Sequence, residues 1–172
     1  MRVRVPEHVI SLLQGELKRA KRREIGGVIV AERLGGDLFQ IADLSVQRGG
    51  GSGFAFMRDP DQHRAFLDDF FARTNYDYTR FNYLGEWHSH PNVPALPSPQ
   101  DVRSMLNIVG DRAVNAPFAL LMIARRRLFG GLDLSATEFR CGERPRPADV
   151  SLGLTGGRFC APRVLCQSVI MR

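Results

Sequence analysis

Two histidines, His88 and His90, are separated by one residue in the segment GEWHSHP. Side chains alternate between the two faces of a β-strand, so an extended segment over residues 81–90 would direct both imidazoles to one face. Imidazole nitrogens are common zinc ligands, and a zinc site needs at least one further protein ligand. Pro91 ends the extended segment, which predicts that the pair lies at the end of a strand beside a loop.

A possible third ligand follows in the segment Ser98-Pro99-Gln100-Asp101. Serine at an N-cap and proline at the first helical position start a helix, here predicted over residues 98–109. Two interpretations of Asp101 are open: it only closes a capping box with Ser98, or it is aimed at the imidazoles as a metal ligand. The hydroxyl of Ser98 could likewise both cap the helix and face a substrate.

Three protein ligands would leave a fourth position for water, which is the arrangement of catalytic zinc. Zinc lowers the pKa of that water to about 7 and polarises a carbonyl group. Such a site also needs a carboxylate that takes a proton and returns it to the leaving group. Glu86 and Glu24 are the two candidates, and strand alternation alone favours Glu86, because it shares a face with both histidines.

The hydrophobic pattern predicts the elements that position these residues. Helices are predicted over residues 6–23, 59–73 and 98–109, and strands over residues 26–32, 38–46, 81–90, 118–124 and 132–139. This order lacks the regular alternation of a doubly wound sheet and predicts an α/β or α+β fold, with a mixed sheet flanked by helices. With 172 residues we expect one domain, with residues 1–140 as its functional part and residues 141–172 as a tail that packs on it or is partly mobile.

The composition is that of a globular protein with an excess of arginine. The formal charge is +6, and only Lys18 and Lys21 of the 24 cationic residues are lysines. Arginine suits both nucleic acid and acidic protein surfaces, but the chain carries no nucleic-acid-binding motif, so we do not expect a nucleic-acid partner. The cations form two tight clusters, at residues 18–23 and 125–127.

Targeting features are also missing from the sequence. The longest apolar run, residues 116–124, is too short to span a membrane, and the N-terminal residues do not have the pattern of a secretory signal. The three cysteines, Cys141, Cys160 and Cys166, form no C-x-x-C pair. We therefore expect a cytoplasmic protein without membrane contact.

The motif residues together resemble the JAMM motif of the JAB1/MPN/Mov34 metalloprotease family. HSHP is followed by six residues, Ser98, two residues and Asp101, and the glutamate that the family places before a glycine pair is matched by Glu24 in EIGGVIV. The resemblance implies that His88, His90 and Asp101 bind one Zn²⁺ per chain. It also implies that Glu24, rather than Glu86, is the general base and then acid, and that Ser98 stabilises the oxyanion. The implied MPN fold is a curved mixed sheet flanked by helices.

Active members of this family are zinc isopeptidases, with zinc-bound water as the nucleophile. This small chain looks most like bacterial JAMM proteins encoded beside E1- and E2-like proteins, including those of antiphage operons. The resemblance implies cleavage of the amide or isopeptide bond after the C-terminus of a ubiquitin-like modifier or conjugated protein. The partner would then be a ubiquitin-like protein or an E1/E2-linked conjugate. An extended substrate tail would add to a sheet edge, and Glu86, Phe54 and Phe56 are candidate substrate-binding residues.

Two other functions stay open. The chain could be a non-catalytic, arginine-rich module that binds nucleic acid or protein, or a JAMM hydrolase that releases a small molecule from a carrier protein. If it is a deconjugating protease, the clusters at residues 18–23 or 125–127 would help to dock an acidic partner.

Overall fold

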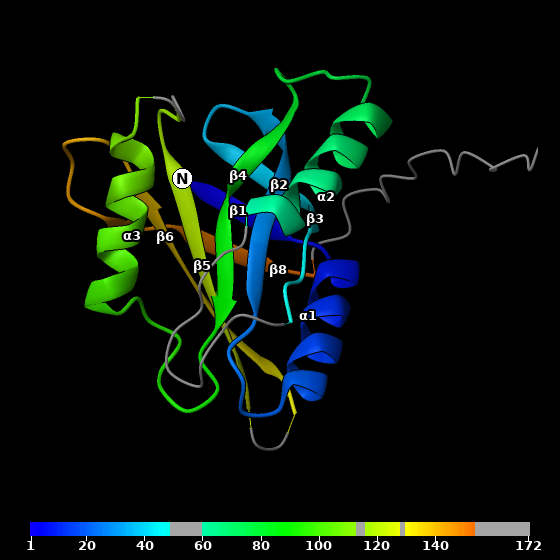
Figure 1. Ribbon diagram of the computed structural model, residues 1–172, viewed down its shortest axis with the longest axis vertical. Helices are drawn as coiled ribbons and strands as arrows, with labels where there is room; N and C mark the ends of the chain where they lie inside the picture. Colours follow the sequence, from blue (N-terminus) through cyan, green and yellow to red (C-terminus); the bar gives the residue numbers. More distant parts are fainter. Residues whose placement is uncertain (49–59, 113–115, 128–129, 154–172) are drawn as a thin grey trace, which may run out of the picture.

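Figure 1 shows a computed structural model that describes residues 1–48, 60–112, 116–127 and 130–153, with side chains except at residues 60–62. The helices are α1 (Glu7–Ala20), α2 (Pro60–Arg73) and α3 (Pro99–Gly110). The strands are β1 (Arg2–Val5), β2 (Gly26–Gly35), β3 (Leu38–Leu44), β4 (Phe81–Ser89), β5 (Ala119–Arg126), β6 (Leu132–Phe139), β7 (Arg146–Pro147) and β8 (Asp149–Leu152). They form one sheet in the order β7-β6-β5-β4-β2-β3-β1-β8.

The helices cover both faces of this sheet. One face carries Trp87 and Met122, which are fully buried in the same apolar cluster as Leu13 of α1. The neighbouring residue of β5, Ile123, points the other way and packs with Met105 of α3. Phe70 of α2 packs against Val30 and Phe81 in a third cluster. The predicted mixed sheet flanked by helices is therefore confirmed.

The strand that carries the histidines, β4, lies in the middle of the sheet. It pairs antiparallel with β2, where His88 lies opposite Gly26, and parallel with β5, where His88 lies opposite Ile123. The backbone N–H of His90 continues the second ladder by donating to the Ala124 carbonyl at 3.0 Å. Both neighbours thus fix the direction in which the end of β4 presents its side chains.

The pairing of β4 is irregular at Gly85, three residues before His88. The register with β2 shifts here, because Ile29 pairs with Gly85 whereas Val30 pairs with Tyr83. Gly85 has a φ of +156°, and a β-carbon on it would lie 1.9 Å from the Leu120 carbonyl oxygen of β5. A side chain at this position would therefore force β4 and β5 apart.

The structure differs from the predicted elements mainly at the ends of the chain. The first helix ends at Ala20 rather than at residue 23, because Lys21 leaves the helical conformation with a φ of 59°. The strands β1, β7 and β8 were not predicted, and β7 and β8 lie within the predicted tail. They have two to four residues each, too few for a periodic pattern. None of the helices in the described ranges has the length and apolar content needed to cross a bilayer.

Replacing Gly85 by alanine should destabilise the protein through the contact with β5. We expect Gly85→Ala to lower the free energy of unfolding by about 2 kcal/mol or more, because the new methyl group meets backbone atoms at a positive φ. The matched control is Gly15→Ala in α1, where no atom lies within 4 Å of the added carbon. That change should stabilise the helix by roughly 0.5–1 kcal/mol. Urea denaturation of both variants measures the difference, and equal stabilities would contradict the close approach of the two strands.

Candidate metal centre

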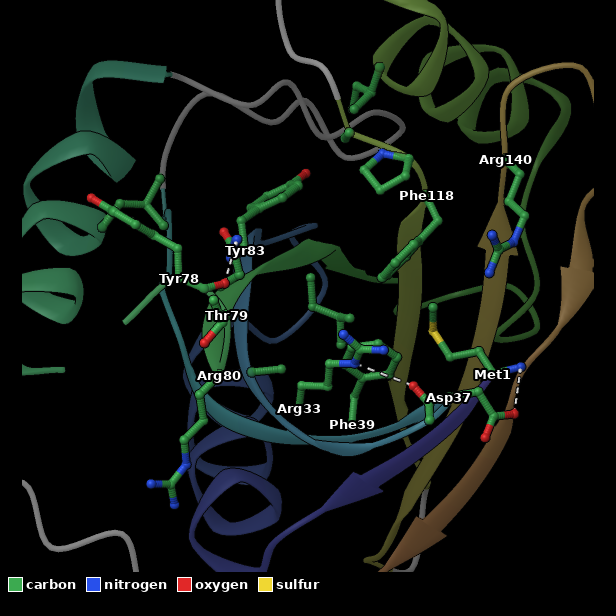
Figure 2. A pocket seen from close by; sticks show the side chains of 18 of the residues that line it. Met1, Arg33, Asp37, Phe39, Tyr78, Thr79, Arg80, Tyr83, Phe118 and Arg140 are labelled. Carbon is green, nitrogen blue, oxygen red and sulfur yellow. Dashed lines mark hydrogen bonds and ion pairs between the residues drawn. The ribbon is translucent and has the colours of Figure 1, made fainter. Parts of the chain in front are cut away.

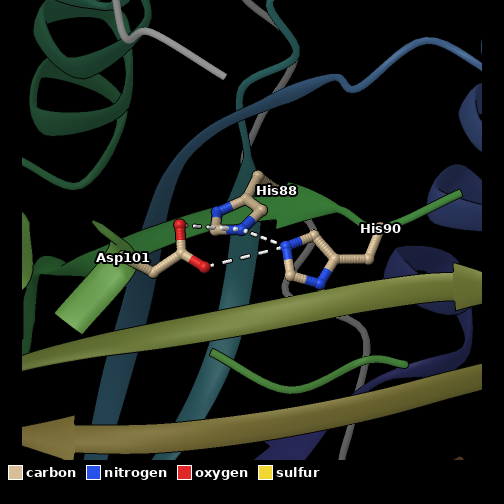
Figure 3. Close-up of side chains that lie close together, drawn as sticks. All are labelled: His88, His90 and Asp101. Atoms are coloured by element: carbon tan, nitrogen blue, oxygen red, sulfur yellow. Dashed lines mark hydrogen bonds and ion pairs between the residues drawn. The ribbon is translucent and has the colours of Figure 1, made fainter. Parts of the chain in front are cut away.

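The side chains of His88, His90 and Asp101 converge at the end of β4 (Figure 3). The Nε2 atoms of the two histidines lie 3.1 Å apart. Asp101 Oδ1 lies 3.4 Å from Nε2 of His88, and its Oδ2 lies 3.7 Å from Nε2 of His90. Both histidines are buried and Asp101 is half-buried. The structure thus brings together three residues that could hold one metal ion.

The spacing of these three residues fits a zinc ion. With bonds of 2.0–2.1 Å, tetrahedral coordination places ligand atoms about 3.3 Å from one another. The three separations of 3.1, 3.4 and 3.7 Å lie around this value. Two imidazoles and one carboxylate are also a donor set that zinc accepts.

The ring of His90 is held in the orientation that a ligand needs. Its Nδ1 lies 3.0 Å from the carbonyl oxygen of Pro94, which can only accept a hydrogen bond. The ring proton is therefore on Nδ1, and Nε2 presents its lone pair to the site. The sequence contained no signal for this support from the proline-rich loop.

Asp101 faces His88 with Oδ1 and His90 with Oδ2, and Oδ2 also caps the start of its own helix. Ser98 is the N-cap of α3, and its backbone N–H donates to Asp101 Oδ2 at 2.7 Å. The backbone N–H of Asp101 donates in return to Ser98 Oγ at 3.2 Å. Since Oδ1 is the oxygen nearer to His88, capping and metal binding are compatible roles.

The electrostatic surroundings keep Asp101 ionised. Burial alone raises the pKa of this carboxyl group, but the hydrogen bond and charge of His88, with the hydrogen bonds of Ser98, outweigh it. The net effect lowers the pKa from 3.8 to about 2. The side chain is thus an anion that needs to lose no proton before it binds a cation.

Glu24 lies two residues before β2, next to the residue that pairs with Ser89 of β4. Next to Glu24, Ile25 is joined to Ser89 by two bonds: Ser89 N–H donates to the Ile25 carbonyl at 2.8 Å, and Ile25 N–H donates to Ser89 Oγ at 3.0 Å. If the antiparallel register continued by one step, Glu24 would lie opposite His90, and opposite residues share a face of the sheet. Glu24 is half-buried and is not one of the three residues of the metal group.

The other predicted site residues lie in different situations. Glu86 is half-buried on β4, opposite Val28 and Leu121, on the face that also carries His88. Ser98 is half-buried at the start of α3. Phe54 and Phe56 lie outside the described residues. The role of Ser89 in binding the Ile25 backbone was not predicted. Its only signal in the sequence was a small hydroxyl residue between two histidines.

A large cavity lies away from the three candidate ligands. It has a volume of about 880 Å³, and Figure 2 shows Tyr83, Phe39, Phe118, Arg33 and Arg140 around it. Tyr83 is seven residues before His90, which is roughly 20 Å along a strand. His88, His90 and Asp101 do not line this cavity. Cavity size and metal-ligand chemistry therefore point to different parts of the molecule, and the chemistry is the more specific indicator.

Comparison with known proteins identifies a family and a solved structure of similar fold. The family described as prokaryotic homologs of the JAB domain matches residues 6–137. The solution structure of protein DSY2949 from Desulfitobacterium hafniense is similar, with a TM-score of 0.62 and 17% sequence identity, over 87% of this chain and 92% of that one. A comparison with curated proteins finds no match.

Substitutions of Asp101 should separate its two roles. Asparagine keeps an oxygen that can accept the Ser98 N–H but loses the charge, so Asp101→Asn should weaken zinc binding by at least about 100-fold and leave the metal-free protein nearly as stable as before. Asp101→Ala should lose the same affinity and in addition about 1 kcal/mol of stability, because the cap is lost. Calorimetric zinc titration and urea denaturation measure the two effects.

The histidines supply the controls for this experiment. His88→Ala should abolish zinc binding, whereas His8→Ala should not change it, because His8 is exposed on α1 and lies beside the Ala42 carbonyl. If Asp101→Asn binds zinc as tightly as the unchanged protein, Asp101 is only a helix cap.

Proposed function

Because this chain belongs to the prokaryotic homologs of the JAB domain, we propose that it is a zinc-dependent peptidase. The observation that carries the proposal is the group of His88, His90 and Asp101, whose ligand atoms lie 3.1 to 3.7 Å apart. A zinc ion held there would lower the pKa of a water molecule and polarise the carbonyl group of the scissile bond.

Glu24 is the proposed proton carrier. A carboxylate at the border of the site takes a proton from water and returns it to the leaving amine. The two hydrogen bonds between Ile25 and Ser89 support this role, because they hold the backbone next to Glu24 against the end of β4. Glu86, two residues before His88 on the same strand, is proposed as a supporting or substrate-facing residue.

Ser98 is the proposed donor to the oxyanion. Its Oγ accepts the backbone N–H of Asp101, and this bond leaves the hydroxyl proton for another acceptor. A donor fixed by a helix cap costs little reorganisation when negative charge develops on the substrate oxygen. The capping box would therefore orient both a metal ligand and the oxyanion donor.

The proposed substrate is the amide or isopeptide bond after the C-terminus of a ubiquitin-like modifier or conjugated protein. The partner would be a ubiquitin-like protein or a conjugate made with E1- and E2-like proteins. The resemblance of HSHP, Ser98 and Asp101 to the motif of small bacterial JAMM proteins supports this choice. The buried histidines at the end of a central strand are also compatible with a narrow, extended substrate.

Cleavage of a fusion between a ubiquitin-like protein and a reporter tests this function. The zinc-loaded protein should release the reporter, and a chelator should stop the reaction until zinc is restored. Glu24→Gln should lower kcat by about 100-fold or more while zinc is retained, because the proton carrier is lost. Glu86→Gln, which removes the same charge from the same face, should keep most of the activity.

Three outcomes would contradict parts of this proposal. Normal cleavage by Glu24→Gln together with an inactive Glu86→Gln would make Glu86 the base. Zinc binding without cleavage of any fusion, but with release of a small molecule from a carrier protein, would replace the substrate class. Failure to bind zinc, together with salt-sensitive binding of nucleic acid, would favour the non-catalytic module.

A further inference from the structure

The two basic clusters of the sequence meet at one hollow in the folded protein. This hollow has a volume of about 150 Å³ and lies between the end of α1 and the end of β5. Its cationic lining residues are Lys21, Arg23, Arg125, Arg126 and Arg127. We propose that this basic hollow binds acidic side chains of the protein substrate, around the end of β4 from the bond that is cleaved. The proposal rests on the proposed peptidase function.

The basic hollow adjoins the candidate metal centre along the chain. Ser89 and Pro91 line it, and they are the residues on either side of His90. Neighbouring α-carbons are about 3.8 Å apart, so the wall of the hollow is one residue away from a candidate ligand. Ala124, which also lines the hollow, accepts the backbone N–H of His90. Leu17, Ala20 and Ala124 of its lining belong to the apolar cluster of Trp87, so the hollow opens on the α1 side of the sheet and the histidines face the other side. A substrate held at the metal centre would therefore reach the hollow around the end of β4.

The charge of the basic hollow is only partly neutralised. Asp133 pairs with Arg125 at 2.7 Å and with Arg127 at 2.5 Å. Lys21, Arg23 and Arg126 form no ion pair with any described residue. By contrast, Arg19 and Arg48, which do not line the hollow, are both bound to buried Glu16. The hollow thus keeps an excess of positive charge that an acidic partner would complement.

The backbone at Lys21 supports a role for its side chain. Lys21 follows the last residue of α1 with a φ of 59° and a ψ of −103°, a conformation in which glycine is strongly favoured. Its N–H still donates to the Leu17 carbonyl at 3.2 Å, so the helix end would be formed equally well with glycine. A strained lysine in place of glycine indicates that the position supplies a cation at some cost in stability.

The lining of the basic hollow favours carboxylates over nucleic acid. None of its residues is aromatic, so the hollow offers no surface on which bases could stack. Three of its five cations are the consecutive arginines of one strand end, and a guanidinium group binds a carboxylate through two parallel hydrogen bonds.

Binding of a fluorescent peptide of alternating glutamate and glycine tests the proposal without any cleavage. Fluorescence anisotropy with the metal-free protein should show salt-sensitive binding, and the peptide with glutamine in place of glutamate should not bind. The double variant Lys21→Glu with Arg126→Glu should weaken binding by about tenfold or more. The matched control, Lys18→Glu with Arg103→Glu, changes the net charge equally at two exposed residues outside the hollow and should weaken binding less than about twofold.

Lys21→Gly provides a second variant that cannot fail by unfolding. It should raise Tm, because it removes the strained φ, and still weaken peptide binding. In the cleavage assay, the double variant should raise KM for a fusion with glutamates several residues from the scissile bond and leave KM for the glutamine version unchanged.

Several outcomes would overturn the proposal. Equal losses in the double variant and its control would mean that only net charge matters. Tighter binding of a single-stranded DNA, lost in the same double variant, would assign the basic hollow to nucleic acid. If cleavage occurs at the same rate with and without acidic residues in the substrate, the role of the basic hollow is contradicted and the peptidase function is not. If the peptide binds with the expected variant pattern but no fusion is cleaved, the peptidase function is contradicted and acidic binding by the hollow is not.

Discussion

The hydrogen-bonded register of β4 between β2 and β5 is the constraint on which the candidate site depends. On one side it joins Ile25 to Ser89 and so brings the segment of Glu24 to the end of β4. On the other side it ties His90 to Ala124. A shift of one residue in either ladder would turn the histidines to the opposite face, into the apolar cluster that contains Trp87. The register is therefore as necessary for the site as the ligands themselves.

The third candidate ligand, Asp101, is held by a different kind of interaction, local to α3. The capping box fixes Asp101 through Ser98, so the ligand is oriented before any metal binds. A half-buried carboxylate is costly unless it is hydrogen-bonded or paired, and both conditions are met here. The same contacts lower its pKa to about 2. The capping box that starts α3 thus also holds the ionised Asp101, a candidate ligand, at a defined position.

Local features of the sequence predicted much of this arrangement, and long-range ones did not. The alternation of His88 and His90 and the helix start at Ser98 are set by neighbouring residues, and both agree with the structure. Alternation could not place Glu24, because its position depends on the pairing of the next residue, Ile25, with Ser89, which is more than sixty residues away. The support of His90 by the Pro94 carbonyl depends on the path of a loop, which side-chain types do not encode.

The role of the glycines near the site also depends on long-range contacts that the sequence does not predict. GEWHSHP and EIGGVIV both contain glycine next to the site residues, and flexibility would be the simplest interpretation of each. The structure gives a steric reason instead. A β-carbon on Gly27 would lie 2.2 Å from the Ser45 carbonyl oxygen, and one on Gly85 would lie 1.9 Å from that of Leu120. Both glycines therefore allow neighbouring backbones to approach, which the sequence alone does not show.

A positive hollow close to a cation site repels a bound metal ion, but the magnitude of this repulsion is small. Two unit charges about 10 Å apart in water interact by roughly 0.4 kcal/mol, and physiological salt screens this further, with a Debye length of about 8 Å. Direct coordination of a metal ion by two imidazoles and the ionised Asp101 would be far stronger than such a repulsion. An acidic chain, by contrast, would meet several cations at contact distance in the basic hollow. The proposed docking of an acidic substrate in the basic hollow would therefore cost little of the affinity for a metal ion, and it would give part of the arginine excess a function.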